Sequence, residues 1–172
     1  MPRHTYDPGG IAAVMAEASA EPGQPDTLFR AVDDLTRETV GHILFTVLAN
    51  LPKSGEVERM HSSRPREYPL LGRKRMGPTP WGDRVLKDGR TWFGRNADDI
   101  RWAFPDHELI LSLGCESCLN APVRYDGRVL GVISVLGPEG AYEEEDLGLL
   151  ALLTPYLVPP LLSAQTTPRS IS

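Results

Sequence analysis

Apolar and polar positions alternate most clearly between Ser117 and Pro138, where the chain reads SCLNAPVRYDGRVLGVISVLGP. Asp126-Gly127 lies at the centre of this stretch and supplies the positive φ angles that a two-residue hairpin turn needs. The second half is apolar at both alternating sets of positions: Val129, Gly131, Ile133 and Val135 on one face, and Leu130, Val132, Ser134 and Leu136 on the other. The pattern therefore predicts two long strands, of which the second is central in a sheet covered on both faces.

The segments on either side predict further elements of the same domain. Residues 27–40 follow a good N-cap, Asp26, and carry apolar side chains at helical spacing. Two buried strands are expected next, at Ile43–Leu48 and Val57–Ser63, joined by a turn. The leucine-rich residues 147–162 predict a terminal helix, which three prolines should kink or end early: Pro155, Pro159 and Pro160.

The middle of the chain is less regular. Arg64–Pro78 is rich in proline and glycine, so we expect an ordered crossing loop there. Thr79 followed by Pro80 marks a helix start. The remaining expected elements are a helix at Trp81–Lys87, a strand at Thr91–Phe93, a helical turn at Asp98–Trp102 and a helix at Pro105–Leu113.

Length and composition indicate one domain. The 172 residues are enough to bury a core, and we expect a flexible or helical segment at 1–25, a domain at 26–163 and a disordered tail at 164–172. We find no apolar run of membrane-spanning length and no signal sequence, which predicts a cytoplasmic protein without a membrane partner. Its two cysteines are then expected to be reduced thiols.

The net charge of −5 is unevenly distributed. Between Arg59 and Arg84 the chain carries seven cations and two carboxylates, so the rest of the chain sums to about −10. That balance argues against a nucleic-acid partner. The basic segment is either a solvated loop or an electropositive lid over an anionic small molecule.

The hairpin and its surroundings resemble the C-terminal half of a GAF domain, a small-molecule-sensing relative of PAS domains. The resemblance rests on four matches: Ala121-Pro122-Val123, Asp126-Gly127, Gly131–Val135, and the acidic Glu143–Leu147 before Leu149–Leu162. It extends over residues 26–163. It implies an α/β (α+β) fold with a GAF/PAS-like central antiparallel sheet and helices on both sides, in which residues 64–114 build the ligand pocket.

Polar and aromatic residues of that region are the candidates for ligand binding. They are His61, Ser63, Tyr68, Trp81, Trp92, Asp98, Arg101, Trp102, Phe104 and Asp106. Some of these residues also have a structural interpretation. The tryptophans could simply pack in the core, and Asp98 and Asp106 could cap helices. Arg101 is expected beside apolar surface, where a guanidinium needs a carboxylate or an anionic ligand.

Four residues are candidates for catalysis: Cys115, Cys118, His61 and His107. They could form a four-ligand metal set, but only the Cys-x-x-Cys spacing is diagnostic, so we predict no metal site, and no cofactor is required. One family of GAF enzymes, the free methionine-(R)-sulfoxide reductases, uses a cysteine thiolate to attack a sulfoxide and then forms a disulfide. Resemblance to that family implies the same role for Cys115 and Cys118. Here the cysteines follow a helix C-terminus and adjoin Glu116, which disfavours a thiolate.

Three functional hypotheses remain. The first is a GAF module that binds a small anionic metabolite and acts as a sensor or through a protein effector. The second is a stand-alone enzyme, using either thiol redox chemistry or acid/base chemistry at His61, His107, Asp98 or Asp106. The third is an adaptor that forms a homodimer through its terminal helices.

Overall fold

A computed structural model describes residues 3–166 and shows one six-stranded antiparallel sheet. Its strand order is β3-β2-β1-β6-β5-β4. The strands are β1 (Leu44–Leu51), β2 (Glu56–Ser62), β3 (Arg73–Arg75), β4 (Trp92–Gly94), β5 (Ser117–Tyr125) and β6 (Arg128–Gly137). The predicted central antiparallel sheet is confirmed.

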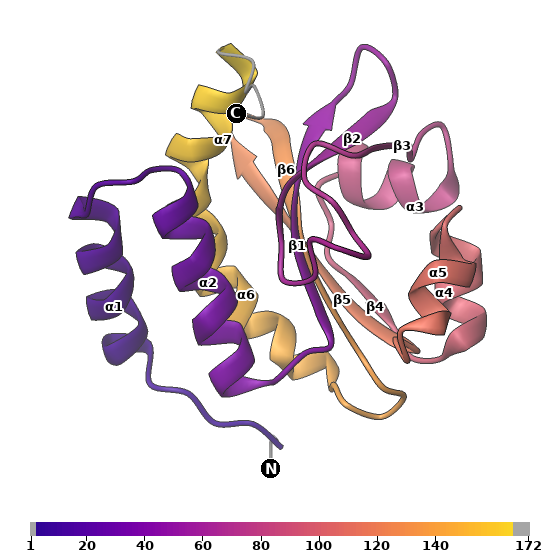
Figure 1. Ribbon diagram of the computed structural model, residues 1–172, viewed down its shortest axis with the longest axis horizontal. Helices are drawn as coiled ribbons and strands as arrows, with labels where there is room; N and C mark the ends of the chain where they lie inside the picture. The colour runs from indigo at the N-terminus through magenta and orange to yellow at the C-terminus, as the bar shows by residue number, and fades with distance from the viewer. Residues whose placement is uncertain (1–2, 167–172) are drawn as a thin grey trace.

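Helices cover both faces of the sheet, also as predicted (Figure 1). One face packs against α1 (Pro8–Ala20), α2 (Asp26–Thr39), α6 (Leu147–Leu153) and α7 (Val158–Thr166). The opposite face packs against α3 (Pro80–Gly82), which continues as the π-helical turn η1 (Asp83–Lys87), and against α4 (Ala97–Ala103) and α5 (His107–Ser112). The sheet therefore separates two hydrophobic cores.

The predicted hairpin is present, with one change of side-chain direction. Asp126 and Gly127 form its turn with φ angles of 50° and 70°. The register then shifts, because Val123 pairs with Gly131 while Arg124 pairs with Val129, so that a β-bulge leaves Leu130 unpaired. Leu130 consequently lies in the core that packs against α1, α2, α6 and α7, and the expected strict alternation was wrong here.

The segment expected to be a loop, Arg64–Pro78, contains the short strand β3, which was not predicted. Its pairing with β2 places Arg73 opposite Glu58, and the two side chains form an ion pair at 2.9 Å. Opposite charges across a strand pair stabilise the pairing, which offsets the low strand propensity of this sequence.

Both ends of the described chain are helical. The N-terminal segment forms α1, whose Ile11 and Met15 are buried in the core. At the other end, α7 extends to Thr166, beyond the expected start of a disordered tail. Residues 167–172 of that expected tail lie outside the described residues.

The leucine-rich C-terminal helical stretch is expected as a helix, but its length also matches that of a membrane span. By length and composition alone, Glu144–Ala164 could cross a membrane, so the prediction that the chain has no such run was wrong. Five of its leucines are nevertheless buried in the core of the sheet: Leu149, Leu150, Leu153, Leu157 and Leu161. Proline also interrupts the stretch as predicted, because a 3₁₀ turn (Thr154–Leu157) separates α6 from α7.

Candidate functional site

The core beneath α3–α5 contains a buried polar chain among apolar side chains. The indole Nε1 of Trp81 donates a hydrogen bond to Asn120 Oδ1 at 3.0 Å, and Asn120 Nδ2 donates to Ser134 Oγ at 2.7 Å. Trp81 is fully buried and contacts Phe104, which also lies edge-on to Trp92. Three of the expected pocket walls therefore do meet, as a packed core.

A cluster of charged and aromatic side chains borders this core, at the β2–β3 edge of the sheet. We call it the Arg59 cluster, and its members are Arg59, Tyr68, Lys74, Phe104 and Asp106. The Arg59 guanidinium lies 3.8 Å from the centroid of the Tyr68 ring. Lys74 Nζ is 3.1 Å from Asp106 Oδ1 and 5.0 Å from the Phe104 centroid. The Tyr68 hydroxyl donates to the other Asp106 oxygen.

Backbone geometry turns Arg59 toward this cluster. In the β1–β2 register, Val47 pairs with His61 and Leu48 pairs with Arg59, so Met60 is the extra residue of a β-bulge. Arg59 therefore faces α5, whereas His61 faces α2. Gly72 lets the loop approach, because a Cβ there would lie 2.7 Å from Arg59 Nη1.

Two cations share one carboxylate in the Arg59 cluster. Arg59 is 7% exposed, and its Nε has no hydrogen-bond partner within residues 3–166, although Nη1 donates to the Pro69 carbonyl at 2.7 Å. Burial, together with the nearby guanidinium, lowers the pKa of Lys74 to about 7. Burial also raises the pKa of Asp106. The cluster thus holds two cations beside one carboxylate, and a buried guanidinium with one unused hydrogen-bond donor.

His61, a candidate for ligand binding and catalysis, lies away from the Arg59 cluster. Its Nε2 is 2.7 Å from Asp33 Oδ2, and His42 Nε2 is 2.7 Å from the other oxygen of the same carboxylate. Ser63 is also used elsewhere, because its hydroxyl accepts a hydrogen bond from the Phe45 amide. His61 therefore ties β2 to α2, on the face of the sheet opposite Arg59.

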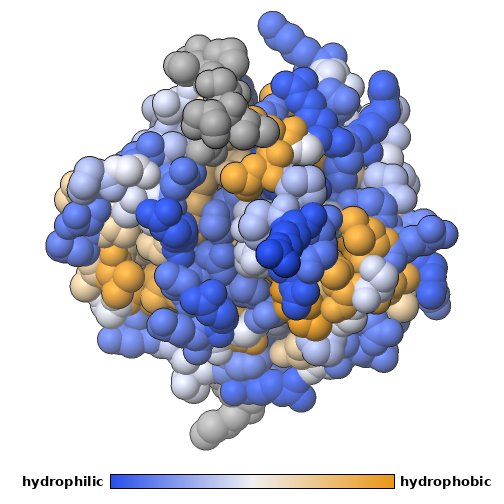
Figure 2. Space-filling view, in the orientation of Figure 1, coloured by the Kyte–Doolittle hydropathy of each residue, from blue (hydrophilic) through white to orange (hydrophobic). Residues whose placement is uncertain are grey.

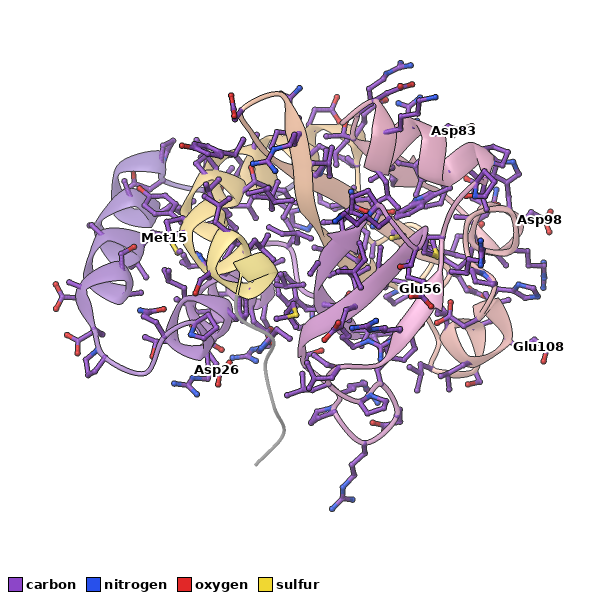
Figure 3. All side chains as sticks on the ribbon, turned by 90° about the horizontal axis from the view of Figure 1, so that it is seen from above. Met15, Asp26, Glu56, Asp83, Asp98 and Glu108 are labelled. Atoms are coloured by element: carbon purple, nitrogen blue, oxygen red, sulfur yellow. The ribbon has the colours of Figure 1, made fainter. Side chains whose placement is uncertain are left out.

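Three further candidates lie at the surface of α4. The Asp98 carboxylate is 90% exposed and points away from the sheet (Figure 3), where it pairs with Arg101 at 2.8 Å. Arg101 is itself exposed, and the Asp98 carboxylate already compensates its charge. Trp102 is 52% exposed and stacks on Trp92. Only Tyr68, Phe104 and Asp106 of the predicted ligand residues meet in the Arg59 cluster.

The two cysteines are buried in the core beneath α3–α5. Burial raises the pKa of Cys115 to about 11 and raises that of Cys118 further. A thiol is a weak nucleophile until it ionises, so neither side chain is prepared for attack on a sulfoxide.

We expect both thiols to react slowly with a disulfide reagent in the native protein. Labelling with dithiobis-nitrobenzoate should proceed at the rate of global or local opening, and it should become fast only in denaturant. Native labelling at the rate of a free cysteine would contradict the buried, un-ionised thiols.

The hypothetical metal set does not assemble. His61 faces α2, whereas Cys115 and Cys118 lie across the sheet, and His107 Nδ1 is 2.9 Å from the Phe104 carbonyl. Among residues 3–166, no group of three histidine, cysteine, aspartate or glutamate side chains is arranged to hold a metal ion.

Two members of the Arg59 cluster were missed as individual residues. Arg59 and Lys74 entered the sequence argument only as part of the basic segment between Arg59 and Arg84. The available signal was the position of Arg59 inside a predicted buried strand, where a cation requires compensation. The bulge at Met60, which decides the face, has no sequence signature that we recognised.

Comparisons with known proteins agree with this architecture. The family model for the GAF domain matches residues 24–157. The GAF domain of an Acinetobacter phosphoenolpyruvate-protein phosphotransferase superposes with a TM-score of 0.69 at 17% identity, covering 95% of this chain and 96% of that one. Comparison with curated proteins returned no match.

Two other solved structures show the variety of proteins that share the fold. Free methionine-R-sulfoxide reductase from Neisseria meningitidis, in complex with its substrate, has a TM-score of 0.67 at 19% identity, with 94% and 95% of the two chains covered. The phycocyanobilin-bound GAF domain of a cyanobacterial phytochrome has a TM-score of 0.69 at 12% identity, with coverages of 96% and 100%. These likenesses show the fold, and the family model matches most of the sequence: the chain belongs to the GAF domain family, whose members are small-molecule-binding sensory domains.

Proposed function

We propose that this GAF domain binds a small anionic metabolite at the Arg59 cluster and passes the signal to a protein effector. The observation that carries the proposal is the buried Arg59 guanidinium, whose Nε has no acceptor within the described chain. A buried charged donor without a partner is costly, and a ligand carboxylate or phosphate oxygen would remove that cost.

Charge balance supports an anion over a neutral ligand. Arg59 and Lys74 face a single carboxylate, that of Asp106. Burial raises the pKa of this carboxylate. An incoming anion would compensate the second cation and keep Lys74 protonated. The aromatic rings of Tyr68 and Phe104 would supply the apolar wall that ligand sites usually combine with a few polar groups.

The side chains that hold the Arg59 cluster together come from separate parts of the fold. Arg59 is on β2, Lys74 is on β3, and Asp106 immediately precedes α5. A ligand that replaces the Lys74–Asp106 contact would therefore change how α5 is held against the sheet edge. Such a change is a means of presenting the bound state to an effector.

Arg59→Gln is expected to weaken binding of the anionic ligand by roughly tenfold, because one charge-assisted hydrogen bond contributes about 1.5–3 kcal/mol and glutamine retains part of the contact. The measurement is a thermal-shift screen of carboxylate and phosphate metabolites, followed by calorimetry on the hits. Arg73→Gln is the matched control, since Arg73 is exposed and already paired with Glu58.

A second readout is the pH dependence of the same affinity. An anion favours protonated Lys74, so the affinity for the anion should fall as pH rises above about 7, which is the pKa of Lys74 in the ligand-free protein. The proposal fails if no metabolite raises the melting temperature, or if a hit binds Arg59→Gln and the parent equally well.

A further inference from the structure

The end of the sheet that carries the β1–β2 and β5–β6 turns is hollowed in two places. The first hollow, of about 440 Å³, lies between the β1–β2 turn, β3 and η1. The second, of about 330 Å³, lies between the end of η1 and the β5–β6 turn. Lys87 lines both. A hydrogen bond connects the two linings: Asn50, which lines the first hollow, donates from Nδ2 to the carbonyl of Val129, which lines the second, at 3.0 Å.

Five exposed cations border these hollows, and we call the whole surface the basic groove. Lys53, Arg75 and Lys87 line the first hollow, and Arg124 and Arg128 line the second with Lys87. Within residues 3–166 none of the five forms an ion pair, unlike Arg73 and Arg101, which are neutralised locally. The cations come from separate elements, so their convergence is a product of the fold.

Three carboxylates are interspersed with the cations. Asp83 lines the first hollow, and Asp88 and Asp126 line the second. The basic groove therefore keeps a net charge of +2 in a chain whose net charge is −5. The contrast marks this end of the sheet as electrostatically distinct, and the surface over the β1–β2 hairpin, at the top of Figure 2, is hydrophilic.

The groove also contains an exposed aromatic side chain. Tyr125, next to the β5–β6 turn, is 49% exposed and lines the second hollow. Tyrosine and arginine are enriched in protein interfaces and among their energetic hot spots. The Arg124 side chain passes close to Gly89, where a Cβ would lie 2.8 Å from Arg124 Cδ, so glycine leaves room for it. A basic and aromatic surface of this kind suits a protein partner.

We propose that the basic groove binds an extended acidic segment of a partner protein. Two consecutive hollows with cations along both match a chain of spaced carboxylates better than one compact ligand. Nucleic acid fits less well, because its dense phosphates would meet Asp83, Asp88 and Asp126 and the acidic remainder of the molecule. The surface is separate from the Arg59 cluster and does not depend on the function proposed for it.

The test uses a short fluorescein-labelled peptide rich in glutamate and aspartate, titrated with the full chain in low-salt buffer and followed by anisotropy. The double variant Lys53→Glu/Lys87→Glu should weaken binding at least tenfold, because it reverses charge in both hollows. The matched control Arg37→Glu/Arg101→Glu makes the same change in net charge at exposed sites elsewhere. Circular dichroism and melting temperature establish that each variant is folded.

Selective loss in the groove variant supports the proposal, and so does retention of peptide binding by Arg59→Gln. Three results would overturn it: no binding of the peptide by the parent, equal weakening in the control variant, or tighter binding of a single-stranded oligonucleotide than of the peptide. Equal weakening would show attraction to positive charge in general, and oligonucleotide preference would assign the groove to nucleic acid.

Discussion

Replacing Trp81 by alanine is expected to lower the free energy of unfolding by about 3–5 kcal/mol, the largest effect of any single change considered for this protein. Trp81 is fully buried between α3 and the sheet, so truncation leaves a large cavity. It also removes the donor to Asn120 Oδ1, which is buried and has no access to solvent. Urea denaturation followed by circular dichroism measures the loss.

Trp102→Ala is the matched control for this prediction. Trp102 is 52% exposed and stacks on Trp92, so its truncation should cost less than about 1 kcal/mol. Trp81→Phe helps to separate the two contributions, because it keeps most of the apolar volume while it removes the hydrogen bond to Asn120. Similar losses in Trp81→Ala and Trp102→Ala would refute the core role of Trp81.

Asp33→Asn is expected to cost about 2 kcal/mol at neutral pH and progressively less in acid. Burial alone raises the pKa of Asp33, but the hydrogen bonds and charges of His42 and His61 outweigh it and lower the pKa to about 2. In the unfolded chain the ordinary value is 3.8. The depressed pKa contributes stability that is present above about pH 4 and is lost as pH falls toward about 2.

The measurement is urea denaturation of parent and variant at a series of pH values. The difference in unfolding free energy should be greatest near neutrality and should shrink in the acid range. Asp34→Asn is the control, because Asp34 is exposed, lies next in the same helix and, among residues 3–166, pairs with exposed Arg37 alone. A difference that stays constant with pH, or an equal effect of Asp34→Asn, would remove the carboxylate of Asp33 as the cause.

Most of the secondary structure follows from local pattern, because the responsible interactions are local. The turn at Asp126-Gly127 needs positive φ angles, and the helix start at Thr79-Pro80 needs a cap and a proline at its first position. The C-terminal helix breaks near Pro155 for a similar reason, since proline lacks the backbone donor. Strand β3 escaped prediction because its support comes from Glu56 and Glu58 on another strand.

The site required the tertiary structure, because β-bulges change which face a side chain occupies. One bulge turns Arg59 and His61 to opposite faces of β2, and another moves Leu130 to the core that packs against α1, α2, α6 and α7. From the amino-acid order alone come the GAF fold, the hairpin at Ser117–Pro138 and the excess of cations between Arg59 and Arg84. Which of those cations become buried together is decided by register and by long-range packing, which local sequence does not encode.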